Sequence, residues 1–261
     1  MTSRTMLLAI DIGNTNIVFG YFEGTLLLAK YRCESTKDTA LSALSELSRR
    51  TFARESIEFG SVTGAIIASV VPSLTNTIAT VVRDLFVVSP VVVCSDTRFD
   101  MPILCDQPSD VGSDRIVNAV AAFDAVRDGV VVIDFGTATT FDCVSPDGEF
   151  LGGVIVPGIE TAASALVARA AKLAPVAIET PHRVVGRNTR HAMQSGLTYG
   201  YASLTDGMIA RINSELGFPC KVLATGGLAS VIQPLVSSID KVLPDLTLEG
   251  LRLVYEINRG K

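Results

Sequence analysis

Two short stretches place an aspartate, a glycine and hydroxyl groups at the end of an apolar run. Residues 7–18 read LLAIDIGNTNIV and residues 130–141 read VVVIDFGTATTF, so Asp11 and Asp134 occupy matching places. A carboxylate at the end of a buried strand is costly unless it is paired or binds a cation, and a nearby glycine lets backbone N–H groups approach a ligand closely. One copy alone would be an ordinary turn. Two matching copies predict a pair of turns that cradle phosphate, with acids placed to hold Mg²⁺ against it.

The absence of two common motifs limits which kind of phosphate-binding site the chain can form. The sequence contains neither GxxxxGK[ST] nor GxGxxG, which excludes a P-loop and the common dinucleotide-binding turn. Neither Asp-x-Gly turn contains a lysine or an arginine. If this site holds ATP, metal ions and backbone dipoles must therefore neutralise most of the phosphate charge.

The composition is that of an ordered globular protein. Of the 261 residues 48% are hydrophobic and 19% charged, and the net charge of −5 comes without a basic stripe, which argues against a nucleic-acid partner. The five cysteines show no CxxC spacing, so a disulfide framework or zinc site is not expected and a reducing cytoplasm is the default location. No apolar run reaches the ~18–20 residues of a membrane span, and no targeting segment is recognised.

The elements that must position the two turns follow from hydrophobic periodicity. Strands are predicted at 6–10, 17–24, 25–34, 65–71, 91–94, 130–134 and 221–225, with a strand meander over 138–156. Helices are predicted at 38–54, 75–86, 113–126, 160–173 and 246–258, and residues 188–216 read as one long helix or two broken ones. Residues 95–112 read as a loop.

Each half of the chain thus opens with a strand and an Asp-x-Gly turn and continues with further strands and helices. This pattern indicates an α/β fold. The division is expected between residues 1–118, with the first turn, and residues 119–261, with the second turn and the Gly-Gly turn at 226–227. The helix at 113–126 would connect the halves.

Several motifs resemble a known family. The paired DxGNT and DxGTA turns with a late TGG at 225–227 resemble the superfamily of actin, Hsp70 and sugar kinases. Within it, GSDRIVNAVAAFD (112–124), EFLGGVIVPGI (149–159), GRNT (186–189) and DLTLEGLRLVYE (245–256) resemble the type III pantothenate kinases, and the match runs from about residue 6 to 258. The resemblance implies two ribonuclease H-like halves, each a mixed β-sheet with flanking helices, and a cleft between them.

The resemblance also implies an activity and a set of site residues. The activity is transfer of the γ-phosphoryl group of ATP to the terminal hydroxyl of pantothenate, the first step of coenzyme A synthesis. Asp114 would be the catalytic base, Asp134 would hold K⁺ or NH₄⁺, and Mg²⁺ would accompany ATP. The ATP contacts would be Asp11, Ile12, Gly13, Asn14, Thr15, Asn16, Ile17, Val18 and Thr137, and the late glycines would pass under the adenosine. The pantothenate contacts would be Cys105, Gly112, Ser113, Asp114, Arg115 and Thr189.

Two features leave alternatives open. Cys105 stands in MPILC where the family often has MPILY, so it either lines the pantothenate pocket or is a packing residue. Gly196, Gly200, Ser203 and Gly207 recur every three or four residues; this glycine stripe favours close helix packing inside the fold, or across the interface of the homodimer that is typical of the family. Two other functions also stay open: a kinase of another small acid-bearing alcohol, and a non-catalytic nucleotide-binding accessory protein.

Overall fold

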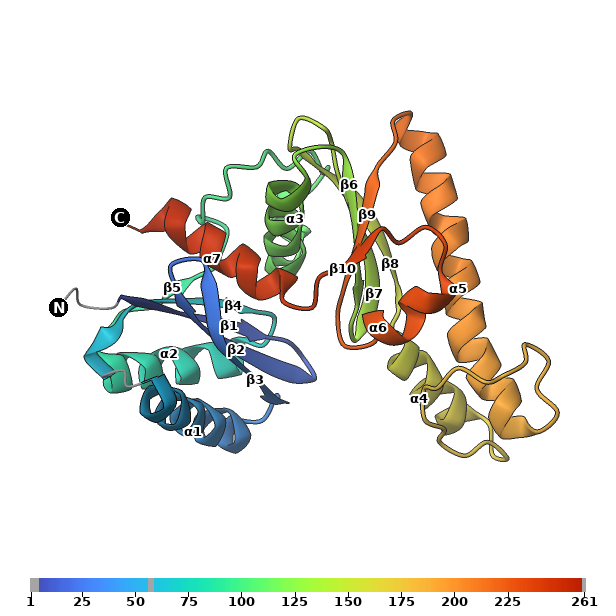
Figure 1. The fold of residues 1–261 in the computed structure, drawn as a ribbon, viewed down its shortest axis with the longest axis horizontal. Helices are drawn as coiled ribbons and strands as arrows, with labels where there is room; N and C mark the ends of the chain where they lie inside the picture. Colours follow the sequence, from blue (N-terminus) through green and yellow to red (C-terminus); the bar gives the residue numbers. More distant parts are fainter. Residues whose placement is uncertain (1–4, 56–58, 260–261) are drawn as a thin grey trace. The chain divides into compact units, whose positions relative to one another are not determined.

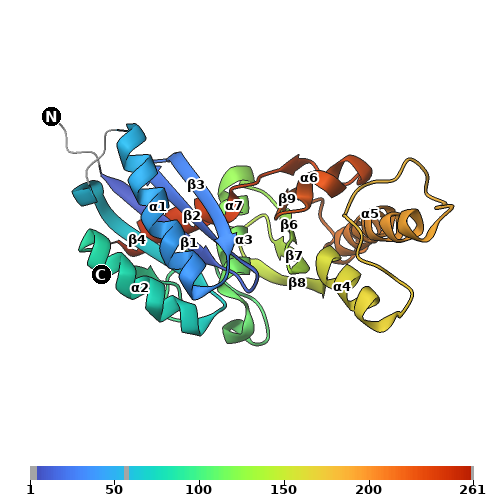
Figure 2. The same cartoon turned by 90° about the horizontal axis from the view of Figure 1, so that it is seen from below.

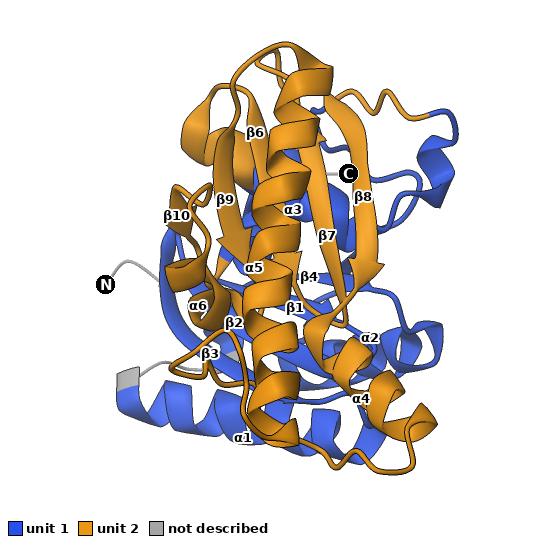
Figure 3. Cartoon of the chain, turned by 90° about the vertical axis from the view of Figure 1, so that its right-hand side faces the viewer, with its two compact units in different colours: residues 1–101, 106–121, 246–261 blue, residues 102–105, 122–245 orange. Residues whose placement is uncertain are grey.

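The computed structural model describes residues 5–55 and 59–259. Two compact units divide the chain (Figure 3): unit 1 comprises residues 1–101, 106–121 and 246–261, and unit 2 comprises residues 102–105 and 122–245. The expected division between residues 118 and 119 differs from this one chiefly at the C-terminus, since residues 246–261 return to unit 1. In the described part of the chain, no helix is both long and apolar enough to span a membrane.

Unit 1 is built on a mixed five-stranded sheet (Figure 1). Its strands lie in the order β3-β2-β1-β4-β5, and their bounds are β1 Met6–Ile12, β2 Asn16–Glu23, β3 Leu26–Glu34, β4 Val62–Ser69 and β5 Val91–Val92. The first three strands form an antiparallel meander, whereas β4 runs parallel to β1 and β5 parallel to β4. The strand-and-meander prediction for residues 6–34 is confirmed, and β5 is shorter than expected.

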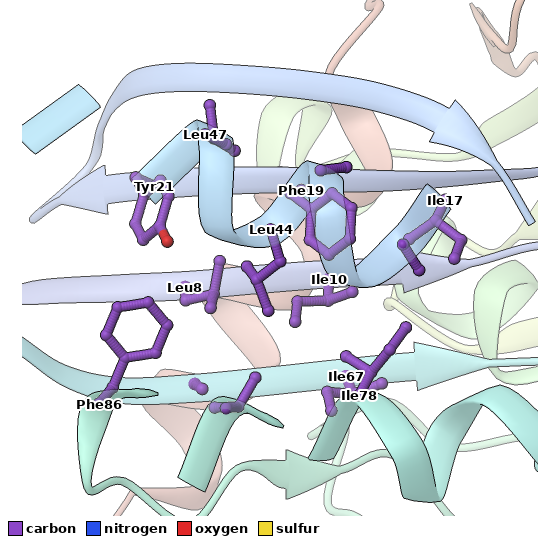
Figure 4. Close-up of a cluster of buried hydrophobic side chains, with 14 of the residues drawn as sticks. Leu8, Ile10, Ile17, Phe19, Tyr21, Leu44, Leu47, Ile67, Ile78 and Phe86 are labelled. Carbon is purple, nitrogen blue, oxygen red and sulfur yellow. The ribbon is translucent and has the colours of Figure 1, made fainter. Parts of the chain in front are cut away.

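One face of this sheet packs against two helices, α1 (Lys37–Glu55) and α2 (Pro72–Phe86) (Figure 2). Alternate residues of β1 and β2 point into the core, where Leu8, Ile10 and Phe19 are fully buried (Figure 4). Tyr21 packs edge-to-face against Phe86 with ring centroids 6.4 Å apart. This buried face fixes the register of β1 and therefore the place where the first turn begins.

The other face of the sheet packs against α7 (Leu246–Asn258). A β-carbon on Gly64 of β4 would lie 2.0 Å from the Tyr255 hydroxyl, and one on Gly250 would lie 2.2 Å from the Val117 carbonyl oxygen in α3 (Ser113–Val126). Gly64 thus leaves room for the Tyr255 ring against the sheet, and Gly250 lets α7 approach the backbone of α3 closely. The last helix therefore completes unit 1, which explains why a single cut through the sequence does not separate the units.

Unit 2 repeats the same sheet topology. Its strands lie in the order β10-β9-β6-β7-β8, with bounds β6 Val130–Phe135, β7 Ala138–Val144, β8 Phe150–Pro157, β9 Lys221–Thr225 and β10 Lys241–Val242. As in unit 1, the first three strands are antiparallel neighbours and the next strand, β9, runs parallel to the first. The two-sheet α/β prediction is confirmed.

Helices α4 (Ile159–Arg169) and α5 (Thr189–Leu216) pack with the sheet of unit 2 (Figure 3). α5 is one unbroken helix, and α4 ends four residues earlier than the predicted end at 173. The hydrophobic periodicity did not predict several short elements. These are helix α6 (Ala229–Ile232), strand β10 and the single-turn 3₁₀ helices at Phe59–Ser61, Pro108–Asp110 and Gln233–Leu235.

Candidate active site

The first predicted phosphate turn joins β1 to β2 in unit 1. The Gly13 N–H donates to the Asn16 carbonyl at 2.9 Å and closes the turn, while Asn14 and Thr15 are exposed. Ile12 and Ile17 flank the turn with fully buried side chains. Of the residues predicted to contact ATP, these two can therefore do so only through their backbone.

The second predicted turn joins β6 to β7 in unit 2 at the matching place. The Gly136 N–H donates to the Ala138 carbonyl at 3.0 Å, and Thr137 is exposed at the tip. Asp134 is half-buried near the end of β6, where it pairs in register with Thr140 of β7 and Thr225 of β9. Side chains that are directly opposite in register share one face of a sheet, so a carboxylate and two hydroxyls gather at this strand end.

Gly226 makes room for the Asp134 carboxylate. It has φ +93°, and a β-carbon built on it would lie 2.4 Å from Asp134 Oδ1. The late TGG segment, which the resemblance assigned to the adenosine side, thus also forms one wall of the carboxylate's site. Asp134 is therefore the residue at this strand end that could hold the predicted monovalent cation. Across residues 5–55 and 59–259, no group of three or more His, Cys, Asp or Glu side chains is arranged to hold a metal ion.

The predicted acceptor residues Gly112, Ser113, Asp114 and Arg115 lie together where α3 begins. The Gly112 carbonyl accepts from the backbone N–H groups of Arg115 at 3.1 Å and Ile116 at 3.3 Å. Asp114 Oδ1 accepts from the Arg115 N–H at 2.9 Å and would be 2.6 Å from a β-carbon on Gly112. The glycine thus lets the carboxylate fold back over the helix start, where backbone N–H groups favour negative charge.

Cys105 lies in unit 2, whereas Gly112 to Arg115 lie in unit 1. The segment before it runs beside β8, because Leu104 N–H donates to the Phe150 carbonyl at 2.8 Å and Phe150 N–H donates to the Pro102 carbonyl at 2.8 Å. The Cys105 thiol is half-buried, with its sulfur 3.7 Å from the position of a β-carbon on Gly152. Its predicted contact with pantothenate remains a prediction.

Thr189 is the first residue of α5, and the GRNT motif builds the start of this helix. Asn188 is the N-cap, and its side chain accepts from the His191 N–H at 2.8 Å. Gly186 packs so closely that a β-carbon on it would lie 2.3 Å from the Ala192 nitrogen. His191 therefore belongs to the cap of this helix.

Thr189 also lines an open, mostly apolar pocket of about 520 Å³ between α4 and α5. Its other lining residues are Ala162, Leu166, Leu173, Ala192, Met193, Gly196 and Leu197. Leu166 and Leu173 fall within the helix predicted over residues 160–173, for which no site was expected. Their periodicity gave no signal of a pocket, because a pocket wall and a core face share the same apolar spacing.

Comparison with solved structures shows the fold to which the two sheets belong. A ROK hexokinase from Thermus thermophilus superposes with a TM-score of 0.55 at 13% identity, covering 98% of this chain and 100% of that one. A protein named for the Baf family of transcriptional activators, from Campylobacter jejuni, superposes with a TM-score of 0.61 at 17% identity, covering 97% and 100%. The two repeated sheets, each with an Asp-x-Gly turn after its first strand, thus have the fold of actin-like proteins and sugar kinases.

Comparison of sequences identifies the family to which the chain belongs. The model of the type III pantothenate kinase family matches residues 7–211. The type III pantothenate kinase of Myxococcus xanthus is 48% identical over 255 residues, which cover 98% of this chain and 100% of that protein. The chain belongs to the type III pantothenate kinase family.

Proposed function

We propose that this protein transfers the γ-phosphoryl group of ATP to the terminal hydroxyl of pantothenate. The observation that carries the proposal is the 48% sequence identity, over 98% of this chain, to a type III pantothenate kinase. This family phosphorylates pantothenate in the first step of coenzyme A biosynthesis. Asp11 and Asp134, the acids of the two turns, and Asp114, at the helix start, are all present. A reducing, cytoplasmic location fits this metabolic role.

In the proposed mechanism the two turns hold the ATP phosphates. Residues 11–18 and Thr137 contact the nucleotide, mainly through backbone N–H groups, since neither turn contains a basic side chain. Mg²⁺ bound to ATP, and K⁺ or NH₄⁺ at Asp134, would supply the remaining positive charge. Asp134, together with Thr140 and Thr225 opposite it in register, would hold the monovalent ion.

Asp114 positions the acceptor hydroxyl and takes its proton. An aspartate is a weak base for an alcohol, but the loose transition state of phosphoryl transfer needs little early deprotonation of the nucleophile. Arg115 pairs with the pantothenate carboxylate, since a guanidinium binds a carboxylate with two parallel hydrogen bonds. Gly112, Ser113, Thr189 and Cys105 complete the acceptor contacts.

The proposed assembly is a homodimer formed through α5. Gly196, Gly200, Ser203 and Gly207 are exposed along this helix. A β-carbon on any of the three glycines would meet no atom of this chain within 4 Å, so close packing inside the fold does not account for the glycine stripe. An exposed row of small residues lets a helix of a second copy approach closely, which supports the dimer.

The deciding experiment follows ADP release and 4'-phosphopantothenate formation with purified protein, MgATP, K⁺ and pantothenate. We expect both products in equal amounts. Turnover only with another acid-bearing alcohol would favour the related kinase activity, and nucleotide binding without turnover would favour the accessory role. The acids at both turns and at the start of α3 argue against that last alternative.

A further inference from the structure

In each phosphate turn, a backbone carbonyl accepts a hydrogen bond from a side-chain hydroxyl that belongs to none of the motifs. In unit 1, Ser35 follows β3; its hydroxyl donates to the Gly13 carbonyl at 2.5 Å and its N–H donates to the Thr15 carbonyl at 3.0 Å. In unit 2, the Thr161 hydroxyl donates to the Thr137 carbonyl at 2.7 Å. Neither residue is among those expected to contact a substrate.

The second contact in unit 2 comes from Gly158, which follows β8. Its N–H donates to the Thr137 carbonyl at 3.0 Å, so this carbonyl accepts two hydrogen bonds. The approach is tight, because a β-carbon on Gly158 would lie 2.2 Å from the Gly136 carbonyl oxygen. The Tyr201 hydroxyl of α5 in turn donates to the Pro157 carbonyl at 2.8 Å and so ties the same segment to the long helix.

The two hydroxyls come from equivalent places in the repeated topology. β3 and β8 are the edge strands next to the second strand of each sheet, and each is followed by a helix, α1 or α4. Ser35 lies just before α1, and Thr161 lies in the first turn of α4. A hydroxyl from this connection thus bonds a carbonyl in each turn: that of the glycine itself in unit 1, and that of Thr137, one residue after the glycine, in unit 2.

These contacts fix the directions of backbone N–H groups. A trans peptide unit is planar, so its C=O and N–H point in opposite directions. Holding the Gly13 carbonyl toward Ser35 therefore turns the Asn14 N–H to the opposite side, and holding the Thr137 carbonyl toward Thr161 does the same for the Ala138 N–H. In turns without basic side chains, such N–H groups are the main donors available to phosphate.

We propose that Ser35 and Thr161 are positioning residues for nucleotide phosphates: each holds one peptide plane of a phosphate turn with its N–H directed at the nucleotide. The inference rests on the proposed kinase function. Neither side chain needs to touch the substrate. Losing one neutral hydrogen bond of this kind should weaken nucleotide binding by about threefold to tenfold.

The test compares Ser35→Ala and Thr161→Val with the wild type by calorimetric titration with MgADP and, separately, with pantothenate. We expect each variant to bind MgADP about threefold to tenfold more weakly and pantothenate unchanged. Ser35→Thr and Thr161→Ser retain a hydroxyl and should restore MgADP binding. This selective loss and rescue would not arise from general destabilisation.

Matched controls remove a hydroxyl that donates to a backbone carbonyl elsewhere. Ser48→Ala removes a donor to the Leu44 carbonyl in unit 1, and Thr205→Val removes a donor to the Tyr201 carbonyl in unit 2. Both controls should lower the melting temperature and leave the MgADP affinity unchanged. MgADP binding within twofold of wild type in both Ser35→Ala and Thr161→Val would overturn the inference.

The outcome separates this inference from the proposed function. A wild type that binds no MgADP would refute the nucleotide site itself. A wild type that phosphorylates pantothenate, together with variants that bind MgADP normally, would refute only the positioning role. If one variant does not fold, as judged by thermal denaturation, the variant in the other unit still decides the question.

Discussion

Replacing Gly226 with alanine tests the arrangement of the second phosphate turn. An alanine β-carbon would lie 2.4 Å from Asp134 Oδ1 and 2.6 Å from both the nitrogen and the carbonyl carbon of Phe135, at a backbone φ of +93°. Contacts below 3.0 Å are essentially never adopted by real β-carbons, so the carboxylate and the end of β6 must move. We therefore expect Gly226→Ala to disturb the predicted cation site as well as the fold.

The expected magnitude follows from two costs. A positive φ costs an alanine about 1–2 kcal/mol, and overpacking typically adds about 1–3 kcal/mol. The total of about 2–5 kcal/mol should lower the melting temperature by roughly 4–20 °C, since each kcal/mol shifts it by about 2–4 °C in a domain of this size. Gly217→Ala is the matched control, because Gly217 has φ +74° with nothing within 4 Å of its β-carbon position. It should show only the backbone cost.

The assay is ADP release as a function of K⁺ concentration at saturating pantothenate. Gly226→Ala should raise the K⁺ concentration for half-maximal activity or lower kcat/KM for ATP by at least about tenfold, a transition-state cost near 1.4 kcal/mol. Gly217→Ala should keep wild-type kinetics. Equal kinetic losses in the two variants, or wild-type melting and kinetics in Gly226→Ala, would refute the role assigned to Gly226.

Four further predictions test the proposed site. Asp114→Asn should fold and bind both substrates but lose about 10²–10⁴-fold in kcat; turnover above about a third of wild type would show that Asp114 is not the base. Because Asp134 is expected to hold a monovalent cation, replacing K⁺ by a bulky organic cation at constant ionic strength should abolish turnover, and full activity would contradict that expectation. Light scattering at micromolar concentration should give a dimeric mass, since the glycine stripe is exposed; a fully active monomer would count against the dimer. Cys105→Tyr should lower KM for pantothenate by at most about tenfold with kcat little changed, whereas a large drop in melting temperature without a gain in affinity would identify Cys105 as a packing residue.

Much of the fold could be predicted because local patterns determine it. The apolar run before Asp11 is a buried strand of the first sheet, and the one before Asp134 is a buried strand of the second. The helix predicted over residues 113–126 has the same bounds in the structure. The recurrence of strand, turn and meander in two halves is a property of the sequence order, so the repeated topology could also be anticipated.

Helix ends and helix continuity were harder to predict because tertiary packing decides them. Three glycines in α5 each cost about 1 kcal/mol relative to alanine, which left open a break in the helix. Burial of Leu197, Ile209 and Ile212 offsets that cost, since burying each such side chain contributes about 1.5–3 kcal/mol. α4 instead ends at Arg169, where the next residue, Ala170, is extended and its N–H donates to the Leu166 carbonyl.

The contacts around the two turns could not be found from sequence, because they join residues far apart in the chain. Gly226 meets Asp134 only once β9 pairs with β6, and Ser35 meets Gly13 only once the meander of unit 1 is formed. A serine after a strand and a threonine in a first helical turn are common capping residues. Their types alone therefore gave no reason to link them to a nucleotide.

These contacts also explain how a phosphate site can work without lysine or arginine in its turns. A basic side chain can reach a phosphate from several rotamers, whereas a backbone N–H binds only if its peptide plane is oriented correctly. Ser35 and Thr161 each fix such a plane by bonding the carbonyl on its opposite edge. Gly158 and Gly226 are close enough to these turns that no side chain fits. If this chain binds ATP as proposed, phosphate recognition depends on the backbone geometry of the turns. Substitutions of Ser35 and Thr161, which hydrogen-bond to those turns, should then weaken nucleotide binding even though they remove no charge.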